Sequence, residues 1–71
     1  MSEQPRSSLG EAYPQEQARV RELLGIYKGL GPVGTFGAVM IEDVLKRADK
    51  AAIEGDVVAM IRLYKEMQGC Q

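Results

Sequence analysis

The sequence predicts a small all-α domain built from three helices. Apolar residues recur every three or four positions in three successive segments, a period that matches one face of a helix rather than a strand. Glycine interrupts this pattern twice, once in the stretch GLGPVGTFG and once at Gly55. A chain of 71 residues makes one domain at most.

The first predicted helix begins at Pro14, because proline suits the first helical position, where its missing N–H would have no partner. A narrow apolar stripe then follows at helical spacing: Val20, Leu23, Leu24 and Tyr27. Lys28 and Gly29 are expected to end the helix with a cation and a left-handed cap. The polar residues 1–12 predict a disordered N-terminal arm, which leaves residues 13–71 as the single helical domain.

The second and third helices follow from turn and cap signals. Pro32 disfavours helix in the stretch around it, and Thr35 is the expected N-cap of a second helix that runs to about Glu54. The Gly55-Asp56 joint ends that helix and caps the third, which runs to about Gln68. So short a joint predicts an antiparallel hairpin of the second and third helices, with the first packed across it.

The small size of the chain predicts a homo-oligomer. A domain this short buries only about 60% of the surface of its unfolded chain and usually needs a further source of stability. Cys70 is the only cysteine and the chain has no histidine, so neither a disulfide nor a zinc site can supply it. The third helix is apolar over roughly 200° of its wheel, beyond the ~100° that one packing contact covers. An interface is therefore expected at Met60, Ile61, Tyr64 and Met67, unless these side chains are simply part of an ordinary surface.

Composition excludes several classes of partner. The net charge of −1 does not favour bulk nucleic acid, whose binders carry a basic excess. No apolar run approaches the ~20 residues of a membrane span. The free thiol and the lack of an apolar signal-peptide core predict a reducing cytoplasm.

Catalytic machinery is also not expected. The absence of histidine removes the usual proton shuttle near neutral pH. Glu42 and Asp43 are adjacent on a predicted helix, so their side chains diverge and cannot share a site. Cys70 lies near the C-terminal end, which is a poor position for a nucleophile. The sequence predicts a protein that is not an enzyme and that has no cofactor or metal.

The glycine-rich stretch superficially matches two nucleotide-binding motifs. Residues 29–34 fit G-x-G-x-x-G, but the dinucleotide-binding motif requires a preceding strand, and here a helix precedes it. A P-loop requires a lysine before the serine or threonine, and Gly34 occupies that position before Thr35. Neither motif applies.

The same stretch instead predicts half of an anion site. Backbone N–H groups at the start of a helix attract anions, and Lys28 could add an ammonium group. The predicted binding residues are Lys28, Gly31, Gly34 and Thr35, with Phe36 or Tyr27 available to stack on a base. A second subunit would have to add further cations, such as Arg19, Arg21, Arg47 or Arg62. The alternative interpretation is that the glycines only make a sharp turn and let two helices approach closely.

A set of positions between residues 20 and 69 forms a pattern of its own: Gly31-Pro32, Gly34, Phe36-Gly37, Met40-Ile41-Glu42, Ala48-Asp49, Gly55-Asp56, Met60 and Tyr64. In this pattern the chain resembles small all-helical proteins, without an assigned activity, that tailed phages and prophages encode. The resemblance implies a bacterial cytoplasm during infection and a role outside the virion.

Two functional hypotheses follow. The first is an anti-defence sponge, an oligomer that sequesters an anionic nucleotide messenger of host immunity without any chemistry. The second is an inhibitor or adaptor that binds a host protein through a helical face rich in Met and Tyr, since flexible methionines suit adaptable interfaces.

Overall fold

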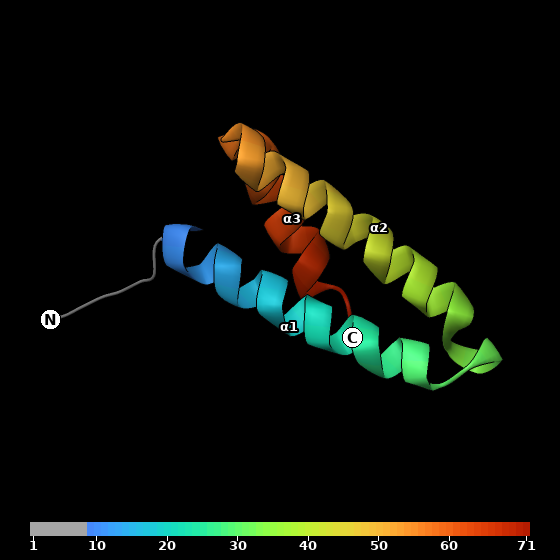
Figure 1. Cartoon of the computed structure of the whole chain (residues 1–71). Helices are drawn as coiled ribbons and strands as arrows, with labels where there is room; N and C mark the ends of the chain where they lie inside the picture. Colours follow the sequence, from blue (N-terminus) through green and yellow to red (C-terminus); the bar gives the residue numbers. More distant parts are fainter. Residues whose placement is uncertain (1–8) are drawn as a thin grey trace, which may run out of the picture.

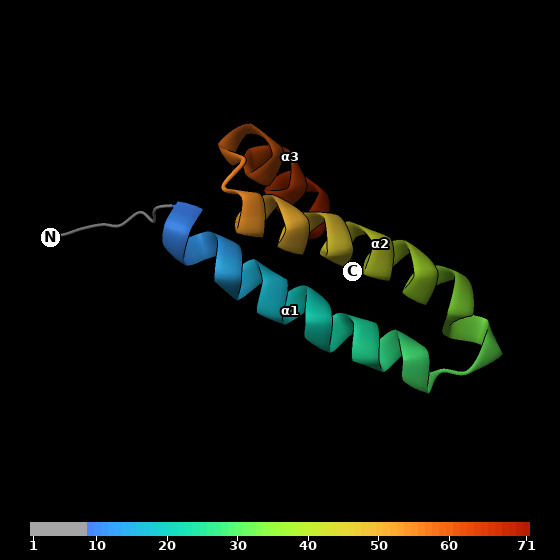
Figure 2. The same ribbon diagram turned by 45° about the horizontal axis from the view of Figure 1, so that its top comes forward.

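The computed structural model describes residues 9–71 and consists of three α-helices, α1 (Leu9–Gly29), α2 (Pro32–Glu54) and α3 (Val57–Gln68). No strand occurs in these residues, which confirms the predicted all-α class and the number of helices. Helices α1 and α2 run alongside each other from the turn that joins them, and α3 folds back from the far end of α2 (Figures 1 and 2). Each helix contacts both of the others.

Helix α1 begins at Leu9, five residues before the predicted start, so Pro14 lies inside it. The residues preceding Pro14 are held in place by a contact with α2, because the buried Tyr13 side chain donates a hydrogen bond to the Ala48 carbonyl at 2.7 Å. This tertiary contact outweighs the one backbone hydrogen bond that proline removes. Residues 9–12 are therefore helical, and the rest of the predicted arm lies outside the described residues.

The connection between α1 and α2 is much shorter than the glycine-rich stretch suggested. Only Leu30 and Gly31 lie between the helices, and Pro32 is the first residue of α2. The positive φ is at Gly31, with φ 70° and ψ −145°, and not at Gly29, where a left-handed cap was predicted. Thr35 is therefore not the N-cap. The preference of proline for the first helical position, which was applied at Pro14, operates here instead.

The joint between α2 and α3 agrees with the prediction. Gly55 has φ 68° and ends α2 in the left-handed conformation, where its N–H reaches the carbonyls of the last helical turn. Asp56 caps α3, because its side chain accepts a hydrogen bond from the Ala59 N–H at 3.1 Å. Both signals are local, which is why the sequence alone located this boundary.

A single apolar core lies where the three helices meet. Its buried members come from all of them: Tyr13, Val20, Leu24, Ala38, Ile41, Leu45, Ala48, Ala51, Leu63 and Met67. The three alanines lie on α2, where a small side chain lets a neighbouring helix pack closely. No polar or charged side chain is buried in the described part of the chain, so apolar burial and helix packing hold the fold together. Within the same residues, no helix is long and apolar enough to cross a membrane.

Candidate functional site

The residues predicted to hold an anion lie around the turn between α1 and α2, but the Gly34 and Thr35 donors already have partners there. The Gly34 N–H donates to the Gly31 carbonyl at 3.0 Å, and the Thr35 hydroxyl donates to the same oxygen at 3.2 Å. Lys28 and Phe36 are exposed, and no hydrogen bond draws Lys28 toward Thr35 within residues 9–71. The structure therefore does not assemble these groups into a pocket.

Two glycines of the stretch serve helix packing. A Cβ atom at Gly34 would lie 2.2 Å from the backbone carbonyl oxygen of Tyr27, and one at Gly37 would lie 2.6 Å from the Tyr27 ring. Both distances are far below van der Waals contact, so α1 and α2 approach closely because these positions lack a side chain. The Tyr27 hydroxyl in turn donates to the Gln71 carbonyl, which uses that group within the chain. These contacts favour the packing interpretation of the glycines.

The residues predicted to form an interface on α3 are divided between core and surface. Met67 is completely buried within the chain, so it is unable to contact another subunit. Met60 and Tyr64 are half-buried against the core, and Ile61 remains 49% exposed. Packing within the chain explains part of the broad apolar arc of α3. This helix packs against both α1 and α2, and two contacts need a wider apolar surface than one.

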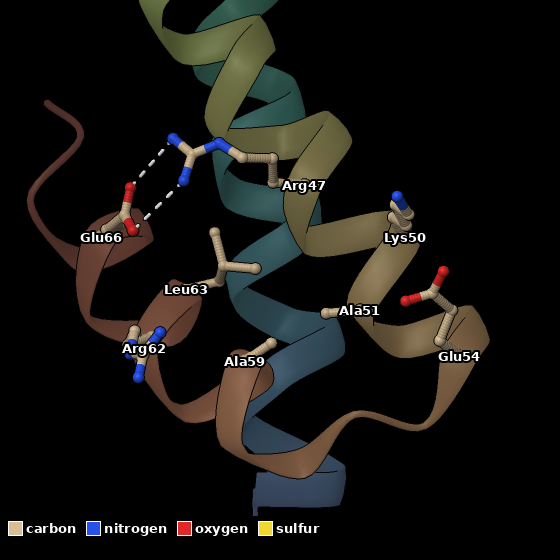
Figure 3. A pocket seen from close by; sticks show the side chains of 8 residues that line it. All are labelled: Arg47, Lys50, Ala51, Glu54, Ala59, Arg62, Leu63 and Glu66. Atoms are coloured by element: carbon tan, nitrogen blue, oxygen red, sulfur yellow. Dashed lines mark hydrogen bonds and ion pairs between the residues drawn. The ribbon is translucent and has the colours of Figure 1, made fainter.

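A groove between α2 and α3 is the feature that sequence reasoning missed (Figure 3). Its volume is about 290 Å³. Apolar side chains lie between the two helices and charged side chains surround them, and the complete lining is Arg47, Lys50, Ala51, Glu54, Ala59, Arg62, Leu63 and Glu66. Ala51 and Ala59 lie on opposite sides of the Gly55-Asp56 joint, so two small side chains leave space where the helices diverge.

The electrostatics of the groove differ from one end to the other. Arg47 binds Glu66 at 3.1 Å and Asp43 at 2.9 Å, and these acceptors, Glu66 foremost, raise the pKa of the Arg47 guanidinium. The charge of Glu66 is thereby neutralised across the groove. No ion pair within residues 9–71 joins Lys50 or Arg62 to an acid. These two cations are therefore available to an anionic group.

The other two arginines considered for the site are engaged elsewhere. Arg19 binds Glu16 and donates to the Met67 and Cys70 carbonyls at 2.6 and 3.1 Å, which caps the C-terminal end of α3. Arg21 pairs with Asp49 on α2 at 2.8 Å. Both contacts tie α1 to its neighbours.

Comparison of the chain with protein families, with curated proteins and with solved structures gives no match. No cluster of three or more His, Cys, Asp or Glu side chains suited to a metal ion occurs in residues 9–71. The α2–α3 groove offers cations beside an apolar floor, an arrangement that can hold an anionic organic molecule.

Proposed function

We propose that this chain is a non-catalytic binding protein that sequesters a small anionic nucleotide in the α2–α3 groove. The observation that carries the proposal is the pair of cations, Lys50 and Arg62, which flank an apolar floor and have no acid partner in the described part of the chain. Ligand sites are typically concave and mostly apolar with a few well-placed polar groups. A phosphate would pair with the cations and a base would lie on the apolar floor.

The proposed site is the α2–α3 groove and not the α1–α2 turn where the sequence predicted it. The donors of Gly34 and Thr35 that were expected to bind an anion are directed at the Gly31 carbonyl instead. The groove supplies what the turn does not: two cations on separate helices and an apolar surface between them.

The size of the groove supports an assembled site. A volume of about 290 Å³ lies just below the ~300–1,000 Å³ typical of ligand pockets, so one chain alone would enclose only part of a ligand. We therefore include in the proposal a homo-oligomer in which α2 and α3 act as an antiparallel hairpin with α1 across it, and in which a second subunit covers the rest of the ligand. In the setting implied by the resemblance to phage proteins, sequestration would remove an immune messenger from the bacterial cytoplasm.

The test is a thermal-shift screen against cyclic mononucleotides, cyclic dinucleotides and linear nucleoside di- and triphosphates, followed by calorimetric titration of any hit. A ligand at a hundredfold excess over Kd stabilises the folded state by about 2.7 kcal/mol. For this small domain that corresponds to a rise in Tm of about ten degrees or more. A panel that leaves Tm unchanged at millimolar concentration would overturn the proposal.

Variants locate the site. Lys50→Glu and Arg62→Glu are each expected to weaken binding by about ten- to a hundredfold, the loss of one hydrogen bond to a charged group. Glu54→Gln removes the remaining unpaired acid of the groove and is expected to strengthen binding. Lys46→Glu makes the same charge change at an exposed position of α2 outside the groove, so it should leave binding unchanged. Equal losses in all three charge-reversal variants would show a general charge effect rather than a site.

An inhibitor or adaptor that binds a host protein is the second candidate, favoured by a different observation. Four aliphatic side chains at the α2–α3 joint are about half or more exposed: Ile53, Val57, Val58 and Ile61. Under this hypothesis Ile61→Asp abolishes capture of a bacterial protein, whereas Lys50→Glu has no effect on it.

A further inference from the structure

The end of the molecule at the α1–α2 turn has only two helices. Helix α3 has 12 residues and α2 has 23, which correspond to lengths of about 18 and 34 Å at 1.5 Å per residue. Because α3 begins at the far end of α2, it ends before the turn (Figures 1 and 2), and residues 69–71 continue along the pair as far as Tyr27, whose hydroxyl donates to the Gln71 carbonyl. The α1–α2 pair therefore continues beyond the end of α3 to the turn without a third helix from the described part of the chain.

An apolar surface covers this two-helix end. Val33, Phe36 and Met40 recur at i, i+3 and i+7, so they share one face of α2. Val33 is 89% exposed and Phe36 is 77% exposed. Ile26 and Leu30, four residues apart at the end of α1 and in the turn, are also more than half exposed. We call these five residues the turn-end surface.

The turn-end surface continues the side of the α1–α2 pair on which α3 packs. Met40 also lines a second groove, about 360 Å³ in volume, together with Tyr27, Gly37, Val44 and the residues that follow α3. Gly37 has no side chain, and the Tyr27 ring lies against it. The apolar face that α3 covers at one end of the molecule is thus uncovered beyond the end of α3.

We infer that a second copy of this chain covers the turn-end surface through the same five residues, and that the two α1–α2 ends form an intermolecular four-helix bundle. Three observations favour this occupant. The first is area: five side chains that each expose more than half of their surface amount to several hundred Å², on the scale of the ~800 Å² per partner of a standard interface. That also reaches the upper range of the largest apolar patch on a typical monomer.

The second observation is charge. None of the five residues is charged, so two identical surfaces can face each other across a two-fold axis without like charges opposing. The third observation is shape. Helix α3 covers one side of the α1–α2 pair near the α2–α3 joint, but no helix within residues 9–71 covers that side near the α1–α2 turn. The α1–α2 end of a second copy supplies helices of matching length for this position. This inference goes beyond the ligand proposal and does not depend on it. The α2–α3 groove lies at the opposite end of α2, so the subunit proposed to cover the groove would use a different contact.

Sedimentation velocity over a wide concentration range, from micromolar upward, measures the mass directly against the 7.8 kDa of one chain. We expect the wild-type protein to associate, and Phe36→Asp and Val33→Asp each to reduce the association at least tenfold. Both side chains are exposed in the single chain, so circular dichroism and Tm should show an intact fold. The matched controls are Val39→Asp, at an exposed position of α2 outside the turn-end surface, and Ile53→Asp, at the other end of α2.

A crosslinking experiment tests the two-fold arrangement. In a Cys70→Ser background, Phe36→Cys is expected to form a disulfide between two copies under mild oxidation, whereas Val39→Cys is not. A wild-type protein that stays monomeric throughout the concentration range overturns the inference. Association that survives Phe36→Asp but is abolished by Ile53→Asp overturns it as well, because the joint end would then be the contact.

Discussion

Replacing Gly34 by alanine tests the role of the glycine-rich stretch, because the added methyl group meets backbone rather than solvent. Its Cβ would lie 2.2 Å from the Tyr27 carbonyl oxygen and 2.9 Å from the Leu30 Cβ, so α1 and α2 would have to separate by more than 1 Å to restore ordinary contact near 3.4 Å. Overfilling a packed site typically costs 1–3 kcal/mol, and this clash involves main-chain atoms that cannot rotate away. We expect Gly34→Ala to lower the free energy of unfolding by about 3 kcal/mol.

That loss is large for this protein. Domains have about 0.05–0.15 kcal/mol of stability per residue, which gives this chain a total of roughly 4–10 kcal/mol. A reduction of about 3 kcal/mol should lower Tm by ten degrees or more. The assay is urea denaturation followed by circular dichroism, with thermal unfolding as a second measurement.

The matched control is Gly25→Ala. Gly25 lies inside α1 and an added Cβ there meets nothing within 4 Å, so alanine should raise the stability by about 0.5–1 kcal/mol through its higher helix propensity. Gly31→Ala is a third case. An added Cβ at position 31 meets nothing within 4 Å, but φ there is 70°, so backbone strain alone should lower the free energy of unfolding by about 1–3 kcal/mol. If Gly34→Ala proved as stable as Gly25→Ala, close packing of α1 and α2 would not be the reason for this glycine.

The further predictions concern three side chains, Tyr13, Asp56 and Cys70. Burial raises the pKa of the Tyr13 phenol, with a smaller contribution from Asp49, so ionisation of this phenol opposes folding. The free energy of unfolding therefore keeps this contribution below pH 10 and should fall as the pH rises above 10. When urea midpoints are compared between about pH 8 and 11, the fall should be steeper in the wild type than in Tyr13→Phe. At neutral pH, Tyr13→Phe should cost about 1 kcal/mol, because the Ala48 carbonyl loses its 2.7 Å hydrogen bond. Asp56→Ala should cost about 1 kcal/mol in the same assay by removing the cap of α3, and Asp56→Asn should restore most of it. Burial also raises the pKa of the Cys70 thiol, so its reaction with a disulfide reagent near pH 8 should be slower in the folded protein than in urea, and equal rates would contradict that placement.

The features that sequence predicted correctly are those with local causes. The three helices follow from apolar periodicity, and the Gly55-Asp56 joint follows from a left-handed glycine and a side-chain cap that involve only neighbouring residues. The start of α1 depends instead on Tyr13 and Ala48, which are 35 residues apart, so no local signal reveals it. At the start of α2 two local preferences compete, and Pro32 rather than Thr35 decides the boundary.

The candidate site was less predictable because it depends on how the helices pack. Met67 continues the apolar stripe of α3 and looked available to a partner, yet the fold buries it between helices. The α2–α3 groove requires Ala51 and Ala59 to face a common space and Lys50 and Arg62 to flank it. The spacing of small residues on either side of the joint was the one signal present, and it specifies a gap only after the direction of α3 is known.

The glycine-rich stretch is best understood through the surface that it creates. At Gly34 the backbones of α1 and α2 come into contact, and at Gly37 the Tyr27 ring lies against α2. With Tyr27 held inward, and its hydroxyl bonded to the Gln71 carbonyl, Phe36 and its apolar neighbours are left on the outside. Phe36 is 77% exposed directly before Gly37, and a stretch that served only as a turn would not require an exposed aromatic side chain at this position. The close helix contact and the exposed apolar surface are therefore two results of the same residues, and this surface is the one through which we propose that two copies associate.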